Sequence, residues 1–72
     1  MKYPLKYRVY EGFNMDGEKF LFSVSNVREI TLREEIAAGE KLIKIGKMLY
    51  ETENRNKARN MTEEYNGYVA EF

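Results

Sequence analysis

Acidic side chains that could carry out acid–base chemistry occur as four close pairs in the sequence. The pairs are Glu34/Glu35, Glu51/Glu53, Glu63/Glu64 and Asp16/Glu18. Two carboxylates share acid–base work only when burial separates their pKa values, and each pair lies where a solvated surface is expected. We therefore predict no catalytic residue among them and expect that the protein is not an enzyme.

The sequence contains neither cysteine nor histidine. The lack of thiols excludes disulfides and thiolate metal sites, and the lack of imidazole removes the commonest general base and metal ligand. Asp16-Gly17-Glu18 has the acidic character of a calcium loop, but the twelve-residue ligand spacing of such loops is missing. We therefore expect no metal and no cofactor.

Basic residues offer a second chemistry, the binding of nucleic-acid phosphates. Residues 55 to 59 alternate basic and polar side chains in an asparagine-rich stretch, and Tyr10 lies in a basic run near the N-terminus that offers stacking surfaces. The predicted interaction residues are Arg8, Tyr10, Lys41, Lys44, Arg55, Lys57 and Arg59. However, the twelve basic and twelve acidic residues cancel, so no overall field attracts nucleic acid or an anionic membrane. A nucleic-acid-binding regulator, active at low salt, is the alternative function.

Aromatic residues favour a protein partner instead. Six tyrosines and four phenylalanines in 72 residues exceed what a small core readily hides, and tyrosine is enriched at protein interfaces. The other interpretation is that the aromatics compensate for a small core. The primary hypothesis is a non-enzymatic protein-binding module that modulates or inhibits a larger partner by covering part of its surface. Exposed strand edges also allow a homodimer.

Residues 31 to 52 are predicted to form one amphipathic helix that organises the fold. At about 100° per residue, eight of the ten apolar residues between positions 32 and 51 fall in one half of the helical wheel. Thr31 and Glu34 have the spacing of a capping box, and Asn26 with Glu29 gives a weaker cap pattern from which the helix could begin instead. The apolar periodicity stops after Tyr50, so a solvated loop is expected from about residue 55.

Gly39 and Gly46 leave a second interpretation of this segment open. Each glycine costs a helix interior about 1 kcal/mol relative to alanine. Both project near the centre of the apolar half, where a missing side chain would let a sheet or a second copy approach closely. The alternative is that the glycines are turns that break residues 31 to 52 into strands.

Asp16-Gly17 predicts a β-hairpin, because it lies between two runs rich in tyrosine, phenylalanine and valine. A two-residue turn there pairs Phe13 with Phe20, and it gives the sheet one apolar face and one mostly polar face. Asn66-Gly67 predicts a second hairpin over residues 61 to 72.

These elements combine into a single α+β domain over residues 1 to 72. The predicted order is β-β-α-β-β, with an antiparallel sheet of two hairpins covered by one amphipathic helix. A small, mostly-β, SH3-like barrel is the alternative. The sequence contains no apolar segment of the length that a membrane span or a signal peptide needs, so we expect no membrane contact and a cytoplasmic location.

Overall fold

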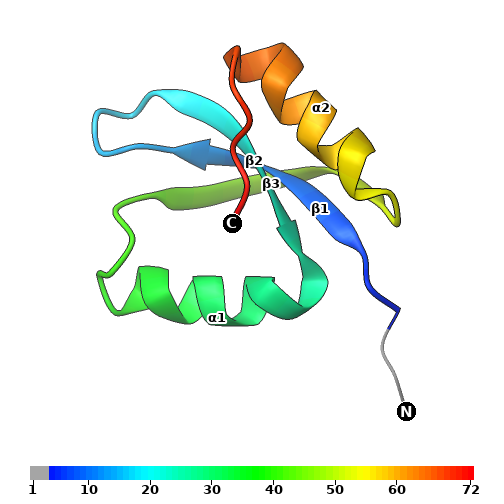
Figure 1. Ribbon diagram of the computed structural model, residues 1–72. Coiled ribbons are helices and arrows are strands. Elements are labelled where there is room, and N and C mark those ends of the chain that lie inside the picture. Colours follow the sequence, from blue (N-terminus) through cyan, green and yellow to red (C-terminus); the bar gives the residue numbers. More distant parts are fainter. Residues whose placement is uncertain (1–3) are drawn as a thin grey trace.

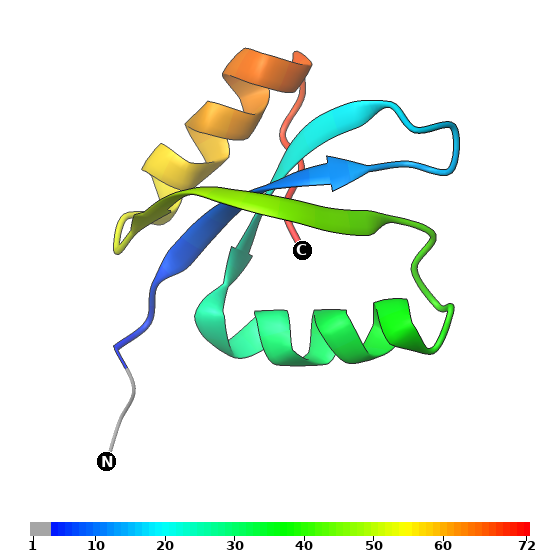
Figure 2. The ribbon, with the colours of Figure 1, turned by 180° about the vertical axis from the view of Figure 1, so that it is seen from behind.

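A three-stranded antiparallel sheet lies between two helices in the computed structural model, which describes residues 4–72 (Figures 1 and 2). The elements in chain order are β1 (Tyr7–Phe13), β2 (Lys19–Ser25), α1 (Asn26–Ala37), β3 (Lys44–Thr52) and α2 (Arg55–Asn66). The strand order is β2-β1-β3. The predicted α+β class is therefore confirmed, whereas the final element is a helix and the sheet is not a closed barrel.

Each face of the sheet packs against its own helix. Tyr10 of β1 and Phe22 of β2 form one core with Leu32 of α1. Val9 and Leu21, which precede them in their strands, form a second core on the α2 side of the sheet. Successive strand residues point to opposite faces, so both faces are apolar. The prediction of one covering helix over a sheet with one wet side is wrong.

α1 begins five residues before the predicted start. The Ser25 hydroxyl accepts the backbone N–H of Arg28 at 3.1 Å and caps the first turn. The Thr31 and Glu34 pair therefore lies inside the helix and does not start it. The weaker cap pattern had indicated this earlier start, although Ser25, and not Asn26, is the cap.

The predicted helix over residues 31 to 52 is wrong beyond residue 37, and its two glycines have different roles. Gly39 has φ of 80°, a left-handed conformation that glycine adopts without steric cost, so the chain turns there as the alternative interpretation held. Gly46 is not a turn, because it lies inside β3. A Cβ added at Gly46 would lie 2.9 Å from the Phe13 ring, so this glycine lets β3 pack closely beside β1.

The first hairpin is confirmed, but its register differs from the prediction by one residue. Phe20 pairs with Gly12 and not with Phe13. The cause is the Asn14 side chain, whose Oδ1 accepts the N–H of Asp16 at 3.0 Å and of Glu18 at 2.9 Å. The resulting loop has three residues, and a one-residue shift turns every side chain of one strand to the other face of its partner.

The second predicted hairpin is wrong, because residues 55–66 form α2. Asn54 caps this helix by accepting the N–H groups of Asn56 and Lys57. Gly67, with φ of 83°, ends it in the left-handed conformation, which glycine supplies at helix C-termini as readily as in hairpins. The solvated loop expected from residue 55 is therefore helical, and residues 67–72 run back beside β2 (Figure 1).

Candidate functional site

The predicted interaction residues lie in three separate places. Arg8 and Tyr10 are in β1. Lys41 lies in the loop before β3 and Lys44 is the first residue of β3. The first turns of α2 contain Arg55, Lys57 and Arg59. The lysines of residues 41–47 are in a loop and a strand and not on a helix, so the predicted basic helix face does not exist.

Arg8 and Tyr10 meet at Glu29 of α1, a carboxylate that the sequence analysis did not select. Glu29 is 8% exposed. It accepts hydrogen bonds from the Tyr10 hydroxyl at 2.8 Å, from Arg8 Nη1 at 3.1 Å and from Arg33 Nε at 3.0 Å. Arg8 also donates through Nε to Glu51 of β3 at 2.7 Å. This cluster ties β1, α1 and β3 together.

The electrostatics of the cluster favour a structural role. Burial raises the pKa of Glu29, but the hydrogen bonds from Tyr10, Arg33 and Arg8 outweigh it, and the pKa lies below its ordinary value. Burial, followed by the hydrogen bond to Glu29, raises the pKa of Tyr10. A carboxylate with three donors and a lowered pKa is a poor general base at neutral pH. The cluster therefore holds elements in place.

Two of the three basic residues of α2 share one carboxylate of the C-terminal segment, Glu71. Arg55 donates to Glu71 through Nε at 3.1 Å and through a second guanidinium nitrogen, and Arg59 lies 3.7 Å from the same carboxylate. The hydrogen bond from Arg55 lowers the pKa of Glu71. Lys57 is exposed and makes no ion pair within residues 4–72.

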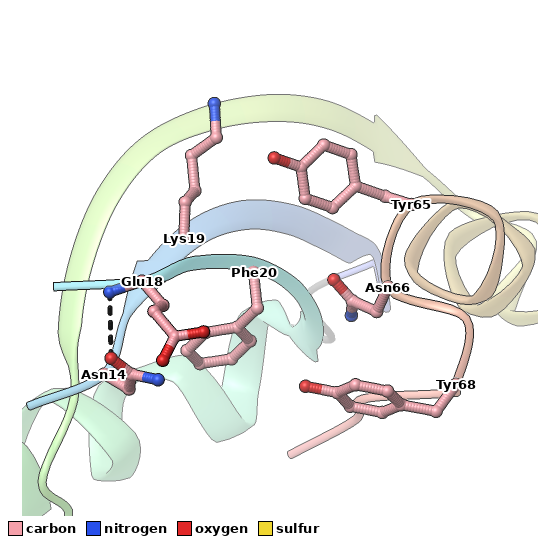
Figure 3. A pocket seen from close by; sticks show the side chains of 7 residues that line it. All are labelled: Asn14, Glu18, Lys19, Phe20, Tyr65, Asn66 and Tyr68. Atoms are coloured by element: carbon pink, nitrogen blue, oxygen red, sulfur yellow. Dashed lines mark hydrogen bonds between the residues drawn. The ribbon is translucent and has the colours of Figure 1, made fainter. Parts of the chain in front are cut away.

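An open hollow of about 260 Å³ lies where the first hairpin meets the end of α2 (Figure 3). Its lining comprises Asn14, Glu18, Lys19, Phe20, Tyr65, Asn66 and Tyr68. The Lys19 ammonium lies 5.8 Å from the centre of the Tyr65 ring, and the Asn14 side chain accepts the Glu18 N–H (Figure 3). The Asn14, Lys19 and Asn66 side chains of this hollow are thus engaged within the chain.

The outer edge of β2 is covered by the chain itself. The Asn66 carboxamide accepts the Leu21 N–H at 2.9 Å and donates to the Leu21 carbonyl at 2.7 Å. Two residues along the strand, Ser23 donates to Ala70 at 3.0 Å and accepts the Phe72 N–H at 2.9 Å. One side chain and a short parallel bridge thereby make the hydrogen bonds that a neighbouring strand would make.

The outer edge of β3 is open. Beyond its ladder with β1, no backbone–backbone hydrogen bond among residues 4–72 involves Lys44–Thr52, and Figure 2 shows β3 at the front, crossing β1, with no further strand on its outer side. Three consecutive apolar residues at its middle are partly exposed, with Met48 at 45%, Leu49 at 43% and Tyr50 at 38%. An edge of this kind is available for pairing with another chain.

Hydrogen-bond alternation shows which way the strands direct their backbone groups. Residues of an antiparallel strand bond alternately to one side and to the other. Leu21 and Ser23 bond outward, as described above, so Phe22 between them bonds to β1. Phe22 faces Tyr10, and the backbone groups of Tyr10 are therefore directed toward β2 and away from β3.

The same alternation identifies the free groups of β3. Met48 is the β3 partner of Tyr10, so its N–H and C=O point to the open side. Ile45 and Glu51 pair with the β1 residues two positions to either side of Tyr10, and their groups also point outward. We call Ile45, Met48 and Glu51 the open-edge residues.

A shallow hollow of about 400 Å³ adjoins the open edge on the α1 side. Its lining comprises Arg33, Ile36 and Ala37 of α1 with Lys44 and Ile45 of β3. This site was missed from the sequence because Lys44 and Ile45 were placed in a helix, although the strand alternative for residues 31 to 52 carried the signal.

Metal-ligand clusters and membrane-spanning helices were also sought in the described chain. Among residues 4–72 no group of three or more acidic side chains could hold a metal ion, and no helix there is long and apolar enough to cross a membrane. In comparisons with known proteins, no family model, no curated protein and no solved structure matches this chain.

Proposed function

We propose that this protein is a non-enzymatic protein-binding module, which takes up an extended segment of a larger partner at the open edge of β3. The observation that carries this proposal is the contrast between the two edges of the sheet. The β2 edge is covered by Asn66 and residues 67–72, whereas the β3 edge directs backbone donors and acceptors to solvent beside exposed apolar side chains. Strand addition to such an edge is a recurring mode of peptide recognition.

Charges along β3 indicate what the bound segment contains. Lys44 and Lys47 lie in its first half and Glu53 follows its end, and none of the three makes an ion pair within the described residues. An antiparallel partner segment would therefore have an apolar centre, a basic first half and an acidic second half. Its apolar side chains would cover Met48 and Leu49.

The nucleic-acid alternative finds less support in these contacts. It depended on residues 55–59 as a free basic loop near helix lysines. Arg55 and Arg59 face Glu71 instead, and Lys41 and Lys44 lie on other elements. No surface of the described chain gathers these cations, so we retain protein binding as the single proposed function.

The test uses extended peptides selected from a displayed random library against the immobilised protein. We expect binders with alternating apolar residues whose addition slows hydrogen exchange at the amides of Ile45, Met48 and Glu51. Met48→Pro removes one outward N–H without touching the ladder with β1, since proline is tolerated at the free edge of a strand. This variant should lose binding, whereas Met48→Ala should retain most of it.

Circular dichroism must show the same fold for both variants. If Met48→Pro is unfolded, the test rests on the wild type alone, through the amides that bound peptide protects from hydrogen exchange. Peptides that protect other amides, such as those around Tyr65 and Tyr68, or a library that yields no binder, would overturn the proposal.

A further inference from the structure

The free backbone groups of β3 have an unusual spacing. In a regular antiparallel strand the residues that bond to one side recur every second position. The open-edge residues recur every third position, because two register shifts place one extra residue on each side of Met48. Each shift adds one residue to β3 relative to β1, as a β-bulge does.

This spacing is symmetric about Met48 and therefore suits a second copy of the same strand. A partner segment matches all three open-edge residues only if it adjusts its own spacing, whereas a second copy of β3 has that spacing already. Two β3 strands that run antiparallel about a two-fold axis at Met48 match all three open-edge residues, Met48 with Met48 and Ile45 with Glu51. Each matched pair also lies on the same face of the sheet, because the β1 partners of all three residues lie on the α1 face.

Charge and apolar surface favour the same arrangement. Antiparallel pairing about Met48 brings Lys44 of one copy opposite Thr52 and next to Glu53 of the other. A parallel pairing would align lysines with lysines. The exposed surfaces of Met48 and Leu49 would be covered in both copies, as an isologous interface requires.

We infer that a second copy of this chain occupies the open edge of β3 when no partner does, through antiparallel pairing centred on Met48. The product is one continuous six-stranded sheet, in the order β2-β1-β3-β3-β1-β2. The inference rests on the proposed function in one respect, since the partner segment and the second copy compete for the same edge. Self-pairing thus limits how much of the edge is available to a partner.

The lack of cysteine in the sequence makes the test direct. Residues that face each other across a two-fold axis in antiparallel strands have Cα atoms about 5.5 Å apart, which is within disulfide range. Met48→Cys should therefore form a disulfide-linked dimer rapidly under mild oxidation. Met15→Cys is the matched control, because Met15 is 72% exposed at the tip of the first hairpin and should link only at the slow rate of random collision.

Sedimentation velocity of the wild type completes the experiment. We expect a dimer at high concentration that dissociates on dilution or on addition of a selected peptide. A wild type that stays monomeric, or cysteine variants that link at equal rates, would overturn self-pairing. Peptide binding with protected open-edge amides would then still support the proposed function. Conversely, rapid linking through Met48→Cys together with a wild-type dimer that no peptide dissociates would support self-pairing and count against the proposed function.

Discussion

The substitution Asn66→Asp tests whether Asn66-Gly67 acts as a hairpin turn or whether the Asn66 side chain covers the edge of β2. Aspartate serves as well as asparagine in a two-residue hairpin turn, so a turn would tolerate the change. In the structure the Asn66 Nδ2 donates to the Leu21 carbonyl at 2.7 Å, and aspartate lacks that donor. After the substitution the Leu21 carbonyl loses its donor and faces a negative charge. Leu21 is only 6% exposed, so water does not readily replace the lost donor.

The expected magnitude follows from the two groups involved. A buried acceptor left without its donor costs about 1–3 kcal/mol, and a negative charge at a helix C-terminus adds roughly 0.3–1 kcal/mol. We therefore expect a loss of about 2 kcal/mol in the free energy of unfolding, which lowers Tm by roughly 10 °C for a domain of this size.

Urea denaturation at neutral pH measures the loss, with Asn60→Asp on the exposed side of α2 as the matched control. Asn66→Ala removes both hydrogen bonds to Leu21 without adding a charge and should cost at least as much as the donor alone. On acidification the new carboxyl takes up a proton and regains a donor, so its penalty relative to wild type at the same pH should shrink. If both variants at position 66 stay within about 0.5 kcal/mol of wild type, Asn66 does not protect the β2 edge.

Three further predictions concern the Glu29 cluster, the glycines and the alternative function. The lowered pKa of Glu29 means that its stabilisation is complete above its ordinary pKa of 4.5 and is lost as the pH falls through the folded-state value. Thermal unfolding should therefore show that acidification below about pH 4.5 destabilises wild type more than Glu29→Gln; equal losses would contradict this role. Gly39→Ala should cost about 1 kcal/mol without raising helicity, and Gly46→Ala about 1–3 kcal/mol through its contact with Phe13, as measured by urea denaturation and circular dichroism; a gain in helicity would restore the long helix. Mobility-shift titration at low salt should detect no nucleic-acid complex, and a complex that weakens steeply with salt would restore that alternative.

The sequence predicted the α+β class and the first hairpin because those features depend on local turn chemistry and on clusters of β-prone residues. It misplaced β3 because the apolar residues around Met48 fit a helical stripe as well as a strand. The pairing with β1 that decides between them depends on residues about 40 positions away, Tyr10 and Arg8 among them, which local periodicity does not reveal.

α2 was missed for a different reason. Its fully buried residues are Ala58 and Thr62, which are too small and too polar to produce an apolar stripe. The helix is instead marked by its ends, Asn54 and Gly67, and an Asn-Gly pair signals a hairpin as strongly as a helix end. In the candidate site, Arg8 and Tyr10 were predicted as interaction residues, and their shared partner Glu29 was missed because it comes from α1, which the sequence placed five residues too late.

The cover on β2 has a consequence for the stoichiometry of assembly. A molecule with one open edge can pair only once through its sheet, so association through β3 ends at two copies. Deleting Ala70–Phe72 would remove the backbone bonds at Ser23 and expose a second edge on each molecule. Growth could then continue through a second edge on each molecule, so association would no longer end at two copies. If the β3 edges pair as inferred, the bonds of Ala70 and Phe72 to Ser23 would limit the assembly to two copies.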